Sequence, residues 1–241
     1  MANPTAAMLV IGDEILSGRT RDANMYHLAG RLTEAGIDLR EVRVVSDNPE
    51  AIICAVQSLA AGFDHVFTSG GIGPTHDDIT ADCIAEAFGR DIDVREDARR
   101  LLADHYARTG KELNAARLRM ARIPEGAALI ENPVSIAPGF ILENVYVMAG
   151  VPSVFQAMVE TMLPKLAGGA PLISETLRID QGEGDIAGPL GVLAQQFPAL
   201  SMGSYPFQQD NGAYGSNVVI RGQDPDMVRA AMEQLSAAFP G

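Results

Sequence analysis

Apolar residues in the first ninety positions form short runs that alternate with segments of helical spacing. The short runs are rich in β-branched residues and indicate strands over residues 6–12, 39–45 and 63–70. The segments that follow them place apolar side chains three and four positions apart and end at a glycine, which indicates helices over residues 22–36, 46–62 and 77–89. This alternation predicts an α/β fold with a mostly parallel sheet covered by helices on both faces.

The next part of the chain is expected to extend this fold. Residues 96–120 have helical spacing with a break at Thr109-Gly110, which predicts a lid or a pair of helices. A strand over residues 140–150 and a helix over residues 151–166 follow.

The pattern changes after the Gly-Gly-Ala-Pro stretch at residues 168–171, which has the composition of a linker. Beyond it we expect a β-α-β-β-α order, with strands over residues 172–180, 200–207 and 216–222 and helices over residues 183–197 and 225–239. The chain is therefore predicted to have two domains, an α/β domain over residues 1–168 and a small α+β domain over residues 169–241.

The excess of acidic residues argues against some classes of binding partner. Among 241 residues the chain has 31 acidic and 18 basic side chains, a net charge of −13, and no run of Lys or Arg. This composition disfavours nucleic acid and anionic membranes as partners, because both are bound through clustered cations. No signal peptide or membrane-spanning stretch is recognised, and we expect a cytoplasmic protein.

The densest candidate chemistry lies in the stretch TSGGIGPTHDDITAD, residues 68–82. Gly70, Gly71 and Gly73 permit a close approach of a ligand to the backbone. Their amide groups, placed before a predicted helix, form a possible phosphate site, and the neighbouring substrate-binding candidates are Ser69, Thr75 and His76. The alternative interpretation is a tight strand-to-helix turn.

Acidic residues follow the first three predicted strands. Ligands bind at the carboxyl ends of parallel strands, and Mg²⁺ binds through one or two carboxylates plus substrate phosphates. We therefore take Asp13, Asp77 and Asp78 as candidate ligands of Mg²⁺ or another divalent cation, and Asp13, Asp47 and Asp78 as candidate catalytic residues. Adjacent acids point apart, so only one of Asp13 and Glu14 is expected to face the site. The alternatives are a solvated turn at Asp13 and helix capping by Asp47, Asp77 or Asp78.

Two later turns complete the candidate site. One precedes the strand at residues 140–150, and the other follows it and is expected at the carboxyl edge of the sheet with the other candidates. Their substrate-binding candidates are Asn132, Pro138, Gly139, Gly150, Pro152 and Ser153. A simple connector is the alternative for the first turn.

These residues resemble a known family. The segments IGDEILSGRTRDAN, VVSDNPEAI, TSGGIGPTHDDITADCIAEAFG, APGF and MAGVPSVFQAM are similar to the molybdopterin-binding (MoCF biosynthesis, MoaB/Mog-like) domain, in the version found at the N-terminus of CinA, the competence/damage-inducible protein A. QGEGDI and GSYP in the tail resemble the small middle domain of CinA. The resemblance does not extend to the C-terminal amidohydrolase domain of CinA, and that activity is not expected.

The resemblance implies a three-layer αβα sandwich, often oligomeric, whose glycine loop binds molybdopterin phosphate or AMP beside acids that act with Mg²⁺. Asp78 and Thr80 match the family's aspartate and threonine after that loop. Asp77 replaces an arginine, which argues against pterin adenylylation and favours a second metal position. Ser135-Ile136 replace a Gly-Thr pair, which points to a different substrate or to lost activity.

Three functions follow from this interpretation. The first is metal-dependent hydrolysis of a nucleoside-diphosphate linkage such as that of ADP-ribose, which the resemblance to CinA-type domains implies. The second is binding of molybdopterin or a nucleotide, with or without adenylyl transfer, in molybdenum cofactor biosynthesis. The third is a non-catalytic homo-oligomer. The expected ligand in the first two is a small phosphorylated molecule.

Overall fold

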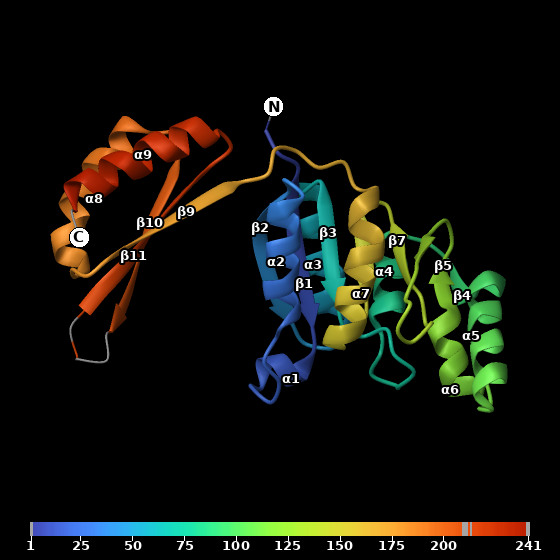
Figure 1. Ribbon diagram of the computed structural model, residues 1–241. Helices are drawn as coiled ribbons and strands as arrows, with labels where there is room; N and C mark the ends of the chain where they lie inside the picture. Colours follow the sequence, from blue (N-terminus) through green and yellow to red (C-terminus); the bar gives the residue numbers. More distant parts are fainter. Residues whose placement is uncertain (1, 209–211, 213, 240–241) are drawn as a thin grey trace. The chain divides into compact units, whose positions relative to one another are not determined.

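The computed structural model describes residues 2–208, 212 and 214–239. The chain divides into two compact units, Met1–Gly169 and Ala170–Gly241 (Figure 1).

The first unit is built on a six-stranded sheet in the order β2-β1-β3-β8-β7-β6. The four strands from β2 to β8 are parallel, and β7 and β6 continue the sheet in antiparallel pairing. The predicted α/β fold with a mainly parallel sheet is confirmed. The strands are β1 (Thr5–Ile11), β2 (Asp38–Val45), β3 (His65–Ser69), β6 (Ala128–Ile130), β7 (Gly139–Leu142) and β8 (Val145–Met148).

Alternation along β1 explains why helices cover both faces of this sheet. Ala7, Leu9 and Ile11 enter one buried core, whereas Met8 and Val10 enter the other. One face is covered by α2 (Asn24–Glu34) and α7 (Pro152–Met162), and the other by α3 (Pro49–Gly62), α4 (Thr80–Ala87) and α5 (Glu96–Thr109) (Figure 1).

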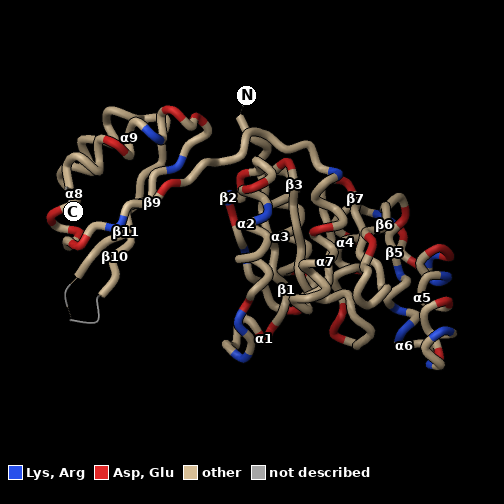
Figure 2. Tube along the Cα trace, viewed as in Figure 1, with Lys and Arg blue, Asp and Glu red and all other residues tan. Residues whose placement is uncertain are grey.

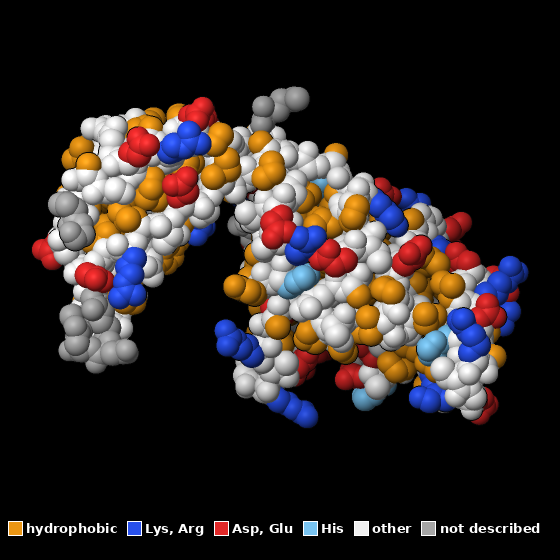
Figure 3. All heavy atoms as spheres, viewed as in Figure 1, with side chains coloured by type: hydrophobic (Ala, Val, Ile, Leu, Met, Phe, Trp, Pro, Cys, Tyr) orange, Lys and Arg blue, Asp and Glu red, His pale blue; other side chains and the backbone are white. Residues whose placement is uncertain are grey.

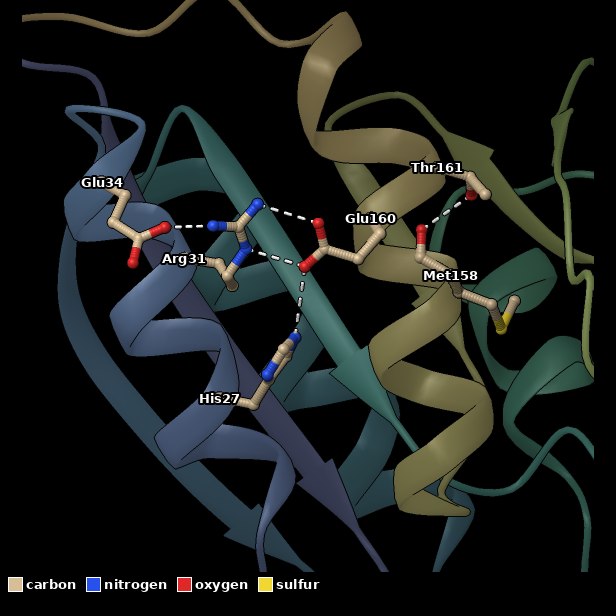
Figure 4. Close-up of polar contacts among 6 residues, drawn as sticks. All are labelled: His27, Arg31, Glu34, Met158, Glu160 and Thr161. Carbon is tan, nitrogen blue, oxygen red and sulfur yellow. Dashed lines mark hydrogen bonds and ion pairs between the residues drawn. The ribbon is translucent and has the colours of Figure 1, made fainter.

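Helices α2 and α7 are joined on the surface by charged side chains (Figure 4). The Arg31 guanidinium donates from Nε and Nη2 to the two carboxylate oxygens of Glu160, at 2.7 and 2.8 Å. Arg31 also pairs with Glu34 on its own helix, and the His27 ring lies 3.6 Å from Glu160. We call Arg31 and Glu160 the clasp.

The predicted helical region near residues 96–120 is a pair of helices. Helix α5 ends at Gly110, which adopts the left-handed conformation (φ 67°), and α6 (Ala115–Leu118) follows. Acidic and basic residues are interspersed along α5, where Glu96 pairs with Arg99 and Arg100 (Figure 2). A two-stranded sheet of β4 (Ile92–Val94) and β5 (Arg122–Pro124) flanks the pair.

Two predicted elements were wrong. The single strand expected over residues 140–150 is a hairpin of β7 and β8, because Glu143 turns the chain with φ 52° and the Asn144 side chain bonds the Ala60 and Phe63 carbonyls. The turn expected after β1 contains a short helix, α1 (Asp13–Leu16).

The second unit has the predicted β-α-β-β-α order. Its antiparallel sheet runs β10-β11-β9, and two helices cover one face over a core of its own (Figure 1). The elements are β9 (Ile173–Ile179), α8 (Glu183–Gln196), β10 (Ser201–Gln208), β11 (Tyr214–Gly222) and α9 (Pro225–Ala238). Within the described residues, no helix in either unit is long and apolar enough to cross a membrane.

Candidate functional site

A cavity of about 550 Å³ lies at the carboxyl ends of β1, β3 and β8. This volume suits a small organic ligand. The sequence predicted candidate site residues at the ends of these strands, and the turns after β1, β3 and β8 all line the cavity. The lining includes Gly12, Glu14, Thr20, Asp47, Gly70, Gly71, Gly73, Pro74, Asp77, Asp78, Met120, Asn132, Ser135, Gly150, Val151 and Pro152.

The glycine loop after β3 adopts conformations that other residues would strain. Gly70 and Gly71 have φ values of 110° and 68°. A Cβ on Gly70 would lie 2.2 Å from the Ile11 carbonyl oxygen, and one on Gly71 would lie 2.1 Å from Thr80 Oγ1. Thr80 is fully buried and fixes the loop, since its hydroxyl donates to the Gly70 carbonyl at 3.0 Å and its amide to the Gly71 carbonyl at 2.9 Å.

The Asp78 carboxylate folds back onto this loop instead of capping a helix. Its Oδ2 accepts hydrogen bonds from the Thr75 amide, at 2.8 Å, and from the Thr75 hydroxyl. Helix α4 begins only at Thr80, after an N-cap residue, Ile79, that makes no side-chain hydrogen bond. The predicted start of this helix at residue 77 was therefore wrong, because the Asp78 side chain bonds the loop that precedes it.

Arg119 holds the same loop from outside the cavity. Its Nη2 donates to the Asp78 carbonyl at 3.3 Å, whereas its Nε is buried without a partner among the described residues. Arg122 beside it pairs with Asp82 at 2.7 Å. Both arginines line a small recess against the glycine loop, and neither lines the main cavity.

Asp47 connects the turns after β1 and β2. Its Oδ2 accepts a hydrogen bond from the Asp13 amide at 2.9 Å. Burial raises the pKa of the Asp47 carboxyl above its ordinary value, and repulsion from Asp13, Glu14 and Asp77 raises it further, against the lowering effect of that hydrogen bond. Asp47 is therefore a carboxylate in a negative, partly dehydrated environment.

One of the two adjacent acids after β1 faces the cavity, and it is Glu14. Its carboxylate lies against Gly12, where an added Cβ would be 2.5 Å from Oε2. Asp13 is exposed and does not line the cavity, although its amide positions Asp47. Asp77 and Asp78, the other candidate metal ligands, both line it.

The other loop candidates have different positions. Ser69 is buried below the cavity and accepts a hydrogen bond from Asn24 at 2.7 Å. Thr75 bonds Asp78, as described above, and the His76 side chain is 99% exposed. None of these three residues lines the cavity, whereas Gly70, Gly71 and Gly73 do.

Of the candidates in the turns before β7 and after β8, some line the cavity and others do not. Gly150 and Pro152 line the cavity, whereas Ser153 does not. Gly139 lies in β7, where an added Cβ would be 2.3 Å from the Val147 carbonyl oxygen, so its role is close packing of the hairpin. Pro138 borders a small recess beside Arg119.

Asn132 lines the cavity, and its side chain forms hydrogen bonds with residues of its own loop. Its Oδ1 accepts from the Val134 and Ser135 amides, and its Nδ2 donates to the Ser135 hydroxyl and the Ala137 carbonyl, at 2.7 to 3.1 Å. It organises the loop that closes this side of the cavity.

Sequence reasoning missed Asn24, a buried residue that joins two strand ends. Its Nδ2 donates to Ser69 Oγ and to the Gly150 carbonyl, and its Oδ1 is buried without a partner among the described residues. The available signal was its position at the start of a helix next to the first strand end.

A metal ion at this cavity would need ligands from a bound molecule as well as from the protein. Within the described residues, no three or more His, Cys, Asp or Glu side chains form a group that could hold a metal ion. One or two carboxylates would therefore supply the protein's share, with phosphate oxygens completing the shell, as Mg²⁺ prefers.

Comparisons with known proteins match both units. The family model described as "Probable molybdopterin binding domain" matches residues 7–168. The model described as "FAD synthase, middle domain" matches residues 171–241, the part whose motifs resemble the middle domain of CinA.

Individual relatives match either part of this chain or nearly all of it. A CinA-like protein from Citrifermentans bemidjiense is 40% identical over 67% of this chain and 40% of its own length. A protein named "Probable FAD synthase" from Caenorhabditis elegans is 32% identical over 98% of this chain and 50% of its own length. A solved structure from Thermoplasma acidophilum, described as the protein CinA with unknown function, aligns with a TM-score of 0.63 at 35% identity, over 67% of this chain and 97% of that one.

Proposed function

This chain belongs to the family of molybdopterin-binding domains, in its CinA-like branch, and we propose that it hydrolyses a nucleoside-diphosphate phosphoanhydride with the help of a divalent cation. The substrate class is a dinucleotide or an ADP-ribose-like nucleotide. The relative named as a FAD synthase supports a nucleotide-type ligand.

The proposal rests on the lining of the cavity, which combines backbone suited to phosphate with several carboxylates. Gly71, Gly73 and the start of α7 line the cavity, and backbone amides at such positions are suited to bind phosphate. Four carboxylates, those of Glu14, Asp47, Asp77 and Asp78, lie on the same cavity, and no Lys or Arg is among its described lining residues. A diphosphate binds beside such acids only when a cation neutralises the repulsion.

We assign different acids of this site to metal binding and to proton transfer. Asp77 and Glu14 would hold the cation, whereas Asp78 accepts the hydrogen bonds from Thr75 and keeps the loop in place. When bound, the cation neutralises the diphosphate and stabilises the charge that develops on it.

Asp47 would act as the general base, since its raised pKa makes it a better proton acceptor than an ordinary carboxylate. It accepts a proton from water as the water oxygen bonds to phosphorus and the bridging P–O bond breaks. With ADP-ribose the products are AMP and ribose 5-phosphate.

Release of AMP tests this proposal. ADP-ribose, FAD and other dinucleotides are incubated with Mg²⁺, Mn²⁺ or Co²⁺, and AMP is measured by chromatography. We expect AMP only with metal, and a loss of about 10²-fold or more in Asp47→Asn, as for removal of a general base. Asp104→Asn, an exposed acid on α5, is the matched control and should retain the wild-type rate.

Binding of molybdopterin or a nucleotide without turnover is the second candidate. The hydrogen bonds from Thr75 to Asp78 and from the Asp13 amide to Asp47 favour it, because they also fit acids that only shape the cavity. No AMP from any substrate, together with ligand binding measured by calorimetry, would replace the first proposal with this one.

A further inference from the structure

Within the described residues of the second unit, no helix packs against one face of its sheet, which we call the uncovered face (Figure 1). Helices α8 and α9 pack against the opposite face, where Val218 and Ile220 are buried (Figure 1). Because side chains alternate along a strand, the neighbours of these residues on β11 point away from the helices. The register places Arg178, Gly203, Tyr205, Phe207, Val219 and Arg221 on this uncovered face.

Two aromatic rings on this face lie against glycines. A Cβ on Gly203 would be 3.3 Å from the ring of Tyr205, and one on Gly215 would be 2.4 Å from the ring of Phe207. The Arg178 guanidinium lies 4.2 Å from the Phe207 ring centroid. Phe207 is therefore already covered, whereas Tyr205 is 49% exposed and offers its ring to a ligand.

Charge is segregated on the same face. Residues 170–241 include eight acidic residues and only three basic ones, Arg178, Arg221 and Arg229. Two of the three arginines lie on the uncovered face. Glu175, the acid within β9, pairs with Ile220 and so lies on the face toward the helices.

Arg221 is available to an anion. Its Nη2 lies 3.4 Å from the Tyr205 hydroxyl, and it makes no ion pair among the described residues. Arg178, by contrast, pairs with Asp180 at 3.2 Å. Tyr205 and Arg221 thus place an exposed aromatic ring beside an uncompensated guanidinium, in a unit that is otherwise acidic.

We propose that this face binds a nucleotide, with the base stacked on Tyr205 and the phosphate paired with Arg221. Aromatic rings stack on any base, and arginine binds phosphate through a planar fork of donors. This would be a second nucleotide site, built from side chains of the second unit and independent of the glycine loop.

Amide chemical shifts of the full-length protein during titration with AMP test the proposal. We expect shifts at Tyr205 and Val219 that saturate with a dissociation constant separate from any change at Gly70–Gly73. Stacking of about 1–3 kcal/mol per base corresponds to a loss of about fivefold or more in Tyr205→Leu. Arg221→Gln should weaken AMP but leave adenosine unchanged, because adenosine has no phosphate.

Arg229→Gln is the matched control, since it removes the unit's third arginine from α9 and should leave AMP affinity unchanged. The proposal is overturned if AMP shifts only the glycine loop, if Arg229→Gln weakens AMP as much as Arg221→Gln, or if Tyr205→Leu, with its fold intact in the same spectra, binds AMP like wild type. Each outcome is read at the second unit, so it does not depend on whether the first unit hydrolyses anything.

Discussion

Asn132 stabilises a backbone conformation that the sequence does not favour by itself. Ile136 has φ 67°, in the left-handed region, which costs a β-branched residue about 1–2 kcal/mol. Such strain persists only where the surroundings over-determine it. Asn132, which is 5% exposed and makes four hydrogen bonds to the loop, supplies that constraint next to the cavity.

We therefore expect Asn132→Ala to lower the free energy of unfolding by about 1–3 kcal/mol, the usual cost of unpairing buried polar groups, and to weaken ligand binding. Urea denaturation and calorimetry measure the two effects. Asn114→Ala removes a cap with one side-chain bond on α6, so it should cost about 1 kcal/mol and leave ligand affinity unchanged. Equal effects on affinity would show that Asn132 has no special role at the cavity.

Residue types and their order predicted the glycine loop, but not which side chains face the ligand. Gly70 and Gly71 could be identified because only glycine tolerates their conformations. Asp13 was chosen over Glu14, whereas Glu14 is the one that lines the cavity, since the outcome depends on how α1 turns the chain after β1. Asn24 was missed because its partners, Ser69 and Gly150, are 45 and 126 positions away.

At the scale of secondary-structure elements, the clasp joins two helices, α2 and α7, whose N-termini lie near the cavity. Helix α2 begins at Asn24, which bonds the Gly150 carbonyl, and α7 begins at Pro152, which lines the cavity. A bidentate arginine–carboxylate pair fixes an orientation better than a single contact does. Both side chains are partly exposed, so solvent screens much of the attraction.

A double-mutant cycle with Arg31→Ala and Glu160→Ala is expected to give a coupling energy of about 0.5–1 kcal/mol in urea denaturation. Arg229 and Asp226 form a control pair within one helix, exposed and with a single contact of 3.3 Å, and should give less than about 0.5 kcal/mol. Coupling that is no larger in the clasp than in this control would contradict a role in helix orientation.

Hydrophobic periodicity predicted most helices and strands of the chain. It failed where tertiary contacts determine the position of a turn. The helices predicted over residues 46–62 and 225–239 are α3 and α9, and the structure shows that Asn48 and Asp224 cap them. The β7–β8 hairpin was predicted as one strand because the turn between its two apolar segments, Glu143-Asn144, contains no glycine or proline. What makes the turn is the Asn144 side chain, which bonds carbonyls near the end of α3.

At the scale of the whole molecule, each unit has its own hydrophobic core. Two buried clusters belong entirely to residues 1–169, and a third belongs entirely to residues 170–241. Apolar side chains on the visible surface of the first unit form scattered groups rather than one continuous patch (Figure 3). A core of this size supports folding of a domain without help from a neighbour.

A fragment of residues 1–169 should therefore fold alone and retain whatever nucleotide turnover or binding the full chain shows at the glycine loop. It should unfold in one cooperative transition, followed by circular dichroism, while losing only the AMP shifts assigned to Tyr205 and Arg221. Light scattering on both proteins would show whether the expected homo-oligomer forms through this unit. A fragment that folds but lacks the activity of the full chain would mean that the second unit contributes to the reaction, and a fragment that does not fold would mean that the two cores are not independent.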